Sequence, residues 1–262
     1  MAADRGELEM TELLIPITLL AFVFAVVAFF YASVGLGGGS SYTALLAVFG
    51  ASTITIPMVS LTLNILVTTF GSIVFLLHGH ARLRLIVPFV VTSVPMAYLG
   101  GMLHLPKMIF YILLMVSLCF AALRIYFPSK SNPLELGERG RLLLAMGSGA
   151  VLGLVAGITG IGGGVYLVPL VILLGLGTAK EAAACGAFFI WANSVSGLLA
   201  RVQFNDIDFM PYLPLVLGVI LGGITGTQMG AGRFQARTMQ KILGSILVVA
   251  VLMLGRKIAQ MA

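Results

Sequence analysis

Two runs of three consecutive glycines, at residues 37–39 and 162–164, are the strongest candidates for a ligand site. Each run lies inside an apolar stretch, where a glycine costs about 1 kcal/mol relative to alanine in a helix. Three in a row therefore predict a break in the helix. A break leaves backbone N–H groups unpartnered at the start of the next helix, where the helix dipole is positive. Such a helix start binds anions, so the two runs predict two facing anion cradles.

Hydroxyl and amide side chains near the glycines are the next candidates. Asn64 and Thr68 are four residues apart and share a helix face, as do Asn193 and Ser196, which are three apart. Their polar groups suit the oxygens of an oxyanion, although hydrogen bonds between neighbouring helices would use them equally well. The predicted anion site comprises Gly37, Gly38, Gly39, Ser40, Asn64, Thr68, Thr159, Gly162, Gly163, Gly164 and Asn193.

Acidic residues are almost absent from the apolar stretches, with Glu181 at the start of one stretch as the exception. Proton relays and cation carriers usually place Asp or Glu within the membrane, so an interior without carboxylates favours an anion. His78, His80 and His104 fall at segment ends, which indicates interfacial positions rather than metal ligands. We therefore predict no catalytic residue, no metal and no cofactor.

The composition explains what kind of protein must position these residues. Of the 262 residues, 60% are hydrophobic and 9% are charged, and the mean hydropathy is +1.11. A soluble domain is about 45–50% apolar and about 25% charged, so a soluble enzyme, a disordered chain and a disulfide scaffold are excluded. The chain is predicted to be a polytopic helical membrane protein. Its net charge of +6 is scattered singly or in pairs, which argues against nucleic acid as a partner.

The chain also repeats itself. A shift of 125 residues places residues 37–39 on 162–164, residues 68–69 on 193–194, and residues 94–101 on 219–226. Each half contains five hydrophobic segments, of which the second is too short to cross a bilayer alone. An odd number of crossings inverts the second half relative to the first, as in many secondary transporters.

The predicted fold is therefore an all-α polytopic membrane protein of two inverted five-segment repeats. It has about eight full spans plus two short half-helices that follow the glycine-rich breaks. The first transmembrane repeat is expected at residues 13–127, a cytoplasmic linker at 128–141 and the second transmembrane repeat at 142–255. With the acidic N-terminus outside, ten Lys and Arg face the cytoplasm and five face outward, which agrees with the positive-inside rule.

The glycine motifs VGLGGGSSY and GITGIGGGVYLVPL, one in each half, resemble those of the sulfite exporter TauE/SafE family of membrane transport proteins. Similar elements are residues 182–186 and the double glycines at 100–101 and 222–223, so the resemblance runs from about residue 13 to residue 254. In the first half, Thr43 and Ala44 stand where the second half has Val168 and Pro169. The resemblance implies export of sulfite, sulfonates or related organic anions across the bacterial plasma membrane.

These observations together predict a secondary transporter of a small anion, sulfite or an organosulfonate, that works by alternating access. A passive anion channel and a non-transporting partner or assembly subunit are the alternatives that the sequence leaves open. An intramembrane enzyme would need a nucleophile and a base paired within the spans, which the rim histidines do not supply. The expected partners are the anionic substrate and the lipid bilayer of the bacterial inner membrane, and a homo-oligomer is left open.

Overall fold

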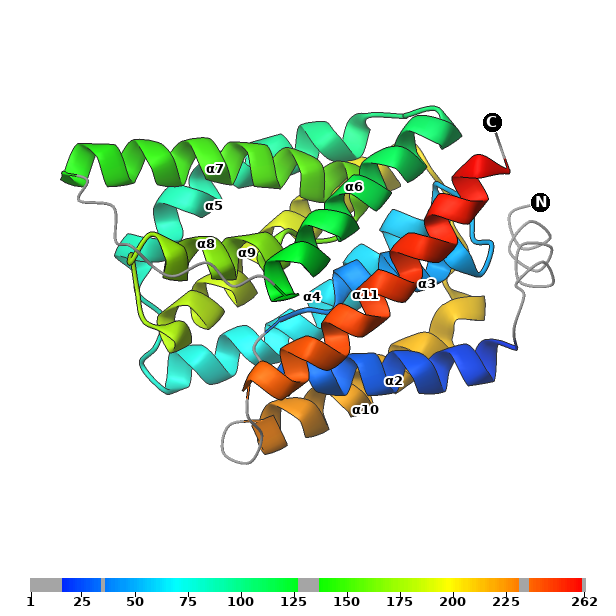
Figure 1. The fold of residues 1–262 in the computed structure, drawn as a ribbon, viewed down its shortest axis with the longest axis horizontal. Coiled ribbons are helices and arrows are strands. Elements are labelled where there is room, and N and C mark those ends of the chain that lie inside the picture. The colour runs from blue at the N-terminus through cyan, green and yellow to red at the C-terminus, as the bar shows by residue number, and fades with distance from the viewer. Residues whose placement is uncertain (1–15, 34–35, 127–136, 231–235, 261–262) are drawn as a thin grey trace.

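The structure is a computed structural model that describes residues 16–33, 36–126, 137–230 and 236–260, and these residues form helices, turns and short connections (Figure 1). The elements are α2 (Ile17–Ser33), α3 (Gly39–Val48), α4 (Thr55–Leu77), α5 (Leu83–Met102), α6 (Lys107–Tyr126), α7 (Glu138–Thr159), α8 (Gly164–Leu173), α9 (Ala179–Val202), the 3-10 helix η1 (Met210–Tyr212), α10 (Leu213–Gly230) and α11 (Ala236–Ala259). The prediction of an all-helical protein is confirmed for this part of the chain.

Six of the described helices are long and apolar enough to cross a membrane. They are α4, α5, α6, α7, α9 and the segment Met210–Gln228, which comprises η1 and most of α10. The helices α2 and α8 are apolar but shorter. The chain is thus a polytopic membrane protein, as its composition predicts.

Both glycine runs interrupt the helical path. The helices α3 and α8 have 10 residues each and begin 125 residues apart, at Gly39 and Gly164. Each follows a left-handed N-cap glycine, Gly38 with φ 88° and Gly163 with φ 82°. This backbone conformation costs an L side chain energy but costs glycine nothing, so the local sequence dictates where the two short helices start.

Two helix pairs form opposite edges of the bundle: α2 runs along α10, and α5 runs along α7 (Figure 1). The backbones approach so closely that a Cβ on any of six glycines would collide with a carbonyl group of the partner helix. Small residues at such contacts are typical of membrane helices. The glycines are Gly149, Gly153 and Gly157 on α7, and Gly218, Gly222 and Gly226 on α10.

The helices α4 and α9 pack against each other in the interior. Of the candidate spans, α9 is the most buried, with 67% of its apolar window inside the protein compared with 33% for α5. The two central helices are therefore the ones that can position a buried site.

The structure covers only part of the predicted boundaries between the two repeats and the linker. The helix α7 begins at Glu138, inside the predicted linker 128–141, and α6 ends at Tyr126. Residues 127–136, like residues 13–15 at the start of the predicted first repeat, lie outside the described residues. The boundaries of the two repeats therefore stay predictions.

The glycine contacts on α7 generate a stability prediction. Gly157→Ala should destabilise the protein by about 1–3 kcal/mol, because the new Cβ would overlap the carbonyl oxygen of Ala97 on α5. Gly147→Ala, on an exposed face of the same helix with nothing within 4 Å, should leave stability unchanged or raise it. Thermal unfolding in detergent measures both variants, and equal melting temperatures would contradict the close α5–α7 contact.

Candidate functional site

The two helix breaks meet against α4, near the middle of that helix. The hydroxyl of Ser60 lies 3.3 Å from the carbonyl oxygen of Gly39 and 3.0 Å from that of Gly160, and its single proton is shared between them. One turn further, the Asn64 amide nitrogen donates to the carbonyl oxygen of Ile161 at 3.3 Å. Residues 36–39 and 160–164 together are called the glycine junction here.

Asn64 lies between the two halves of the glycine junction. A Cβ on Gly37 would lie 2.9 Å from Asn64 Oδ1, and one on Gly162 would lie 2.8 Å from Asn64 Nδ2. A Cβ on Gly39 would collide with Asn64 Nδ2 and with the Ile161 carbonyl oxygen. Glycine at these positions lets the backbone of both breaks approach one amide side chain.

The remaining predicted glycines face other neighbours. A Cβ on Gly163 would lie 2.8 Å from the ring of Phe189, and one on Gly164 would collide with Ile190, so both pack against α9. A Cβ on Gly38 would lie 2.6 Å from the Tyr42 hydroxyl. The six predicted glycines are thus brought together, with Asn64 on one side and the centre of α9 on the other.

Two helix N-termini converge at the glycine junction. The first intrahelical hydrogen bonds of α3 come from the N–H groups of Ser41 and Tyr42, and those of α8 from Tyr166 and Leu167. The N–H groups that precede them belong to the first turn, which has no intrahelical acceptor. Neither N-cap glycine has a side chain to cap these groups. The positive ends of both helix dipoles therefore point into this region.

The three predicted hydroxyls are engaged within the protein. Ser40 Oγ lies 2.6 Å from the hydroxyl of Tyr31, and Thr68 donates to the carbonyl oxygen of Asn64 at 2.7 Å. Thr159 donates to the carbonyl oxygen of Val155 at 2.7 Å, and its oxygen accepts from the N–H group of Ile161 at 3.4 Å. In this conformation these hydroxyls support the two breaks and are not aimed at a solute.

Several buried polar atoms on α3, α4 and α9, the helices that border the glycine junction, have no hydrogen-bond partner among the described residues. They are Asn64 Oδ1, both amide atoms of Asn193, and the hydroxyls of Ser194 and Tyr42. Asn193 and Ser194 are fully buried, and a Cβ on Gly162 would lie 3.5 Å from Ser194 Oγ. A buried polar group without a partner costs about 1–3 kcal/mol. A cluster of such groups is therefore typical of a site that accommodates a polar ligand.

Arg201 is a functional candidate that the sequence does not reveal. Its position at a helix end predicts a charge facing the outer surface, but only 6% of the residue is exposed. Its Nη2 donates to the carbonyl oxygens of Gly157 (2.9 Å) and Ile158 (2.7 Å), in the last turn of α7 before the break. The long side chain thus turns inward to cap the negative end of a helix dipole, and the predicted orientation of this helix end toward the outer side stays a prediction.

The buried side chains carry a marked charge asymmetry. Arg201 is the only charged residue that is buried in the described part of the chain, and no carboxylate is buried there. It lies on the same face of α9 as Asn193 and Ser194, two turns further along. Ser60 is a second residue that sequence reasoning misses, although its spacing of four from Asn64 was a usable signal.

Three hollows on the surface of the bundle lie away from the glycine junction. One of about 400 Å³ opens between α6 and α11, and one of about 370 Å³ between α2, α3 and α11. A third, of about 300 Å³, lies where α5 and α7 begin. The glycine junction itself is closely packed, so a solute could enter it only if the central helices moved.

Comparison with known proteins finds a matching family and several related membrane proteins. The family described as Sulfite exporter TauE/SafE matches residues 20–254. "Probable membrane transporter protein y4hK" of Sinorhizobium fredii is 33% identical over 88% of this chain and 95% of its own length. "Probable membrane transporter protein YjnA" of Bacillus subtilis is 25% identical over 82% of this chain and 91% of its own.

No solved structure matches the chain significantly. The family match covers both glycine runs, α4, α9 and Arg201, and thus every element from which the candidate site is built. The chain therefore belongs to the sulfite exporter TauE/SafE family.

Proposed function

We propose that this protein is a secondary transporter that carries a small oxyanion, sulfite or an organosulfonate, across the bacterial plasma membrane by alternating access. One observation carries the proposal. Two helix N-termini lie beside unpartnered polar groups, a buried guanidinium caps the end of α7 that leads into the second break, and no carboxylate is buried in the described residues. The interior therefore favours negative charge.

The chemistry of each group suits an oxyanion. N–H groups at the starts of α3 and α8 donate hydrogen bonds and add dipole charge. The Asn193 amide and the Ser194 hydroxyl are buried donors that the protein leaves unused. A charged side chain within the membrane is costly unless it is matched, and Arg201 has only carbonyl oxygens as partners in the described residues. A bound anion would offset part of that cost.

The arrangement of the helices supports alternating access. In the proposed repeats, residues 13–127 and 142–255 joined by the linker 128–141, α2 corresponds to α7 and α5 to α10. The pairs α2–α10 and α5–α7 are then equivalent, because each joins the first helix of one repeat to the fourth of the other. Movement of these pairs around α4 and α9 would open the closed glycine junction to one side at a time.

The names of the relatives support transport rather than catalysis. The family is described as a sulfite exporter, and the relatives are named as membrane transporters. We infer the substrate, sulfite or an organosulfonate, from the family description together with the positive charge of Arg201 and of the two helix N-termini. A passive channel would instead give flux that does not saturate, and a non-transporting subunit would give no flux in purified liposomes.

The unpartnered groups on α9 give the sharpest test. Ser194→Ala should lower kcat/KM for sulfite uptake into proteoliposomes about tenfold, the value of one lost hydrogen bond to a charged group. Its melting temperature should stay the same or rise, because the hydroxyl has no partner in the protein. Ser196→Ala is the matched control on the same helix: it loses a 2.7 Å bond to the Val94 carbonyl oxygen, and so should lose stability but keep transport.

The reverse pattern, with Ser194→Ala destabilised and its transport unchanged, would contradict the proposed site. Saturation of flux with sulfite, measured on the wild-type protein in the same liposomes, separates a carrier from a channel. Absence of any flux with sulfite, thiosulfate, taurine and sulfoacetate would contradict the proposed function as a whole.

Arg201 generates a prediction about charge. Arg201→Gln should lower sulfite flux tenfold or more, while Arg201→Lys, which keeps the positive charge, should restore a measurable part of it. Lys257→Gln is the control, because Lys257 likewise donates to a carbonyl oxygen near the end of a helix, that of Ala47 at 2.8 Å, but at the far end of α3. It should lower the melting temperature without changing the apparent KM. Equal flux losses in Arg201→Lys and Arg201→Gln would indicate a structural role only.

A further inference from the structure

A second concentration of positive charge lies outside the candidate site, at the end of the bundle where α5 and α7 begin. A hollow of about 300 Å³ is lined there by the first turns of both helices and by Leu176 from the connection between α8 and α9. Three arginines line it, and Glu138 is the one acidic residue in the lining. The arginines are Arg82, Arg84 and Arg141. The hollow is called the arginine hollow below.

Most of the remaining lining of the arginine hollow is apolar. Its other lining residues include Pro88 and Phe89 from α5 and Leu142 and Ala145 from α7. Phe89 is fully buried, whereas Arg82 and Arg84 are exposed. The hollow therefore offers charge at its mouth and hydrocarbon contact further in, which is the pattern that an amphiphilic anion requires.

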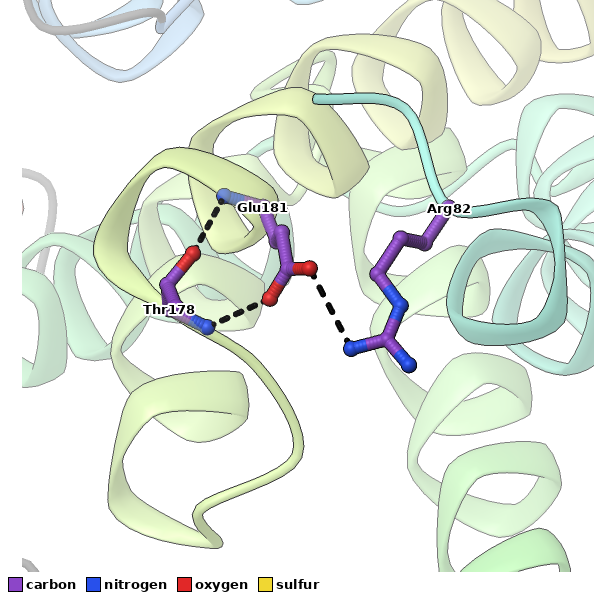
Figure 2. Close-up of polar contacts among 3 residues, drawn as sticks. All are labelled: Arg82, Thr178 and Glu181. Atoms are coloured by element: carbon purple, nitrogen blue, oxygen red, sulfur yellow. Dashed lines mark hydrogen bonds and ion pairs between the residues drawn. The ribbon is translucent and has the colours of Figure 1, made fainter. Parts of the chain in front are cut away.

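Arg82 is held in position by the start of α9 (Figure 2). Its Nη1 lies 3.2 Å from Oε1 of Glu181, and the other carboxylate oxygen of Glu181 accepts from the Thr178 N–H group at 2.7 Å. The Thr178 hydroxyl in turn accepts from the Glu181 N–H group at 3.3 Å. Such an exposed pair contributes little to stability, but the capping box orients the arginine beside the hollow.

The backbone adds to the positive potential. Arg82 is the N-cap residue of α5 and Gly137 that of α7, and neither supplies a side-chain hydrogen bond to the first turn of its helix. Both first turns, with their N–H groups and positive dipole ends, form part of the wall of the arginine hollow. Arginine in addition matches the oxygens of phosphate and sulfonate in bidentate geometry.

We propose that the arginine hollow binds the headgroup of an amphiphilic oxyanion, a phosphate or sulfonate that carries an apolar chain, with the arginines on the oxygens and the chain against α5 and α7. Two sources share this chemistry: an anionic phospholipid of the surrounding membrane and a soluble alkyl sulfonate or phosphate. The proposal does not depend on the transport function, because its residues lie apart from the glycine junction.

The test uses the purified full-length protein in a neutral detergent. Short-chain phosphatidylglycerol is compared with phosphatidylcholine, and 1-octanesulfonate is compared with octyl glucoside, by native mass spectrometry and thermal shift. We expect at least one anionic probe to bind more than tenfold tighter than its neutral analogue. Arg82→Gln and Arg84→Gln should each weaken that binding severalfold, while Lys180→Gln, a nearby cation that is not among the lining residues, should leave it unchanged.

The two probes separate the sources. Preference for phosphatidylglycerol alone identifies a lipid site, and preference for octanesulfonate alone identifies a site for a soluble anion. Equal binding of anionic and neutral probes would overturn the proposal. The same conclusion would follow if both arginine variants, with unchanged melting temperatures, bound the anionic probes as tightly as the wild-type protein.

Discussion

The structure depends on one constraint: backbone N–H and C=O groups within a membrane must find partners inside the protein. The two helix breaks would violate it if each stood alone in lipid. Here the carbonyl oxygens exposed by the breaks accept hydrogen bonds from Ser60 and Asn64 of α4, and those at the end of α7 accept from Arg201. Irregular backbone is tolerated because both breaks share one set of buried donors.

The carbonyl groups and the N–H groups at the glycine junction differ in how they are hydrogen-bonded. Carbonyl groups of the breaks accept hydrogen bonds from α4 and Arg201. In contrast, no side chain caps the first-turn N–H groups of α3 and α8, and the side chains of Asn193 and Ser194 on α9 have no hydrogen-bond partner. In the proposed transporter, the two helix N-termini together with one buried cation would suit an anion. Because residues 37–39 and 160–164 are buried, the proposed transport would couple entry of a solute to movement of the helices.

Sequence reasoning succeeded where the signal is local. Three consecutive glycines are poor helix formers, and the structure has helix breaks at both predicted runs, with α3 and α8 beginning at the last glycine of each run, Gly39 and Gly164. It failed where the partner is distant in the chain. The Ser60 contact with Gly160 and the Arg201 contact with Gly157 join residues 100 and 44 positions apart, and no pattern in one sequence specifies such pairs. Ser40 is likewise a predicted site residue, but its hydroxyl pairs with that of Tyr31, and this contact depends on tertiary packing.

The central claim is that an oxyanion is held between the starts of α3 and α8. Selenite is a close chemical analogue of sulfite, and its selenium can be located directly by anomalous diffraction from soaked crystals. We expect an anomalous peak near Ser194, placed so that the selenite oxygens accept hydrogen bonds from the first-turn N–H groups of both short helices. Peaks confined to the arginine hollow or to the protein surface, with the glycine junction unoccupied at saturating selenite, would contradict it.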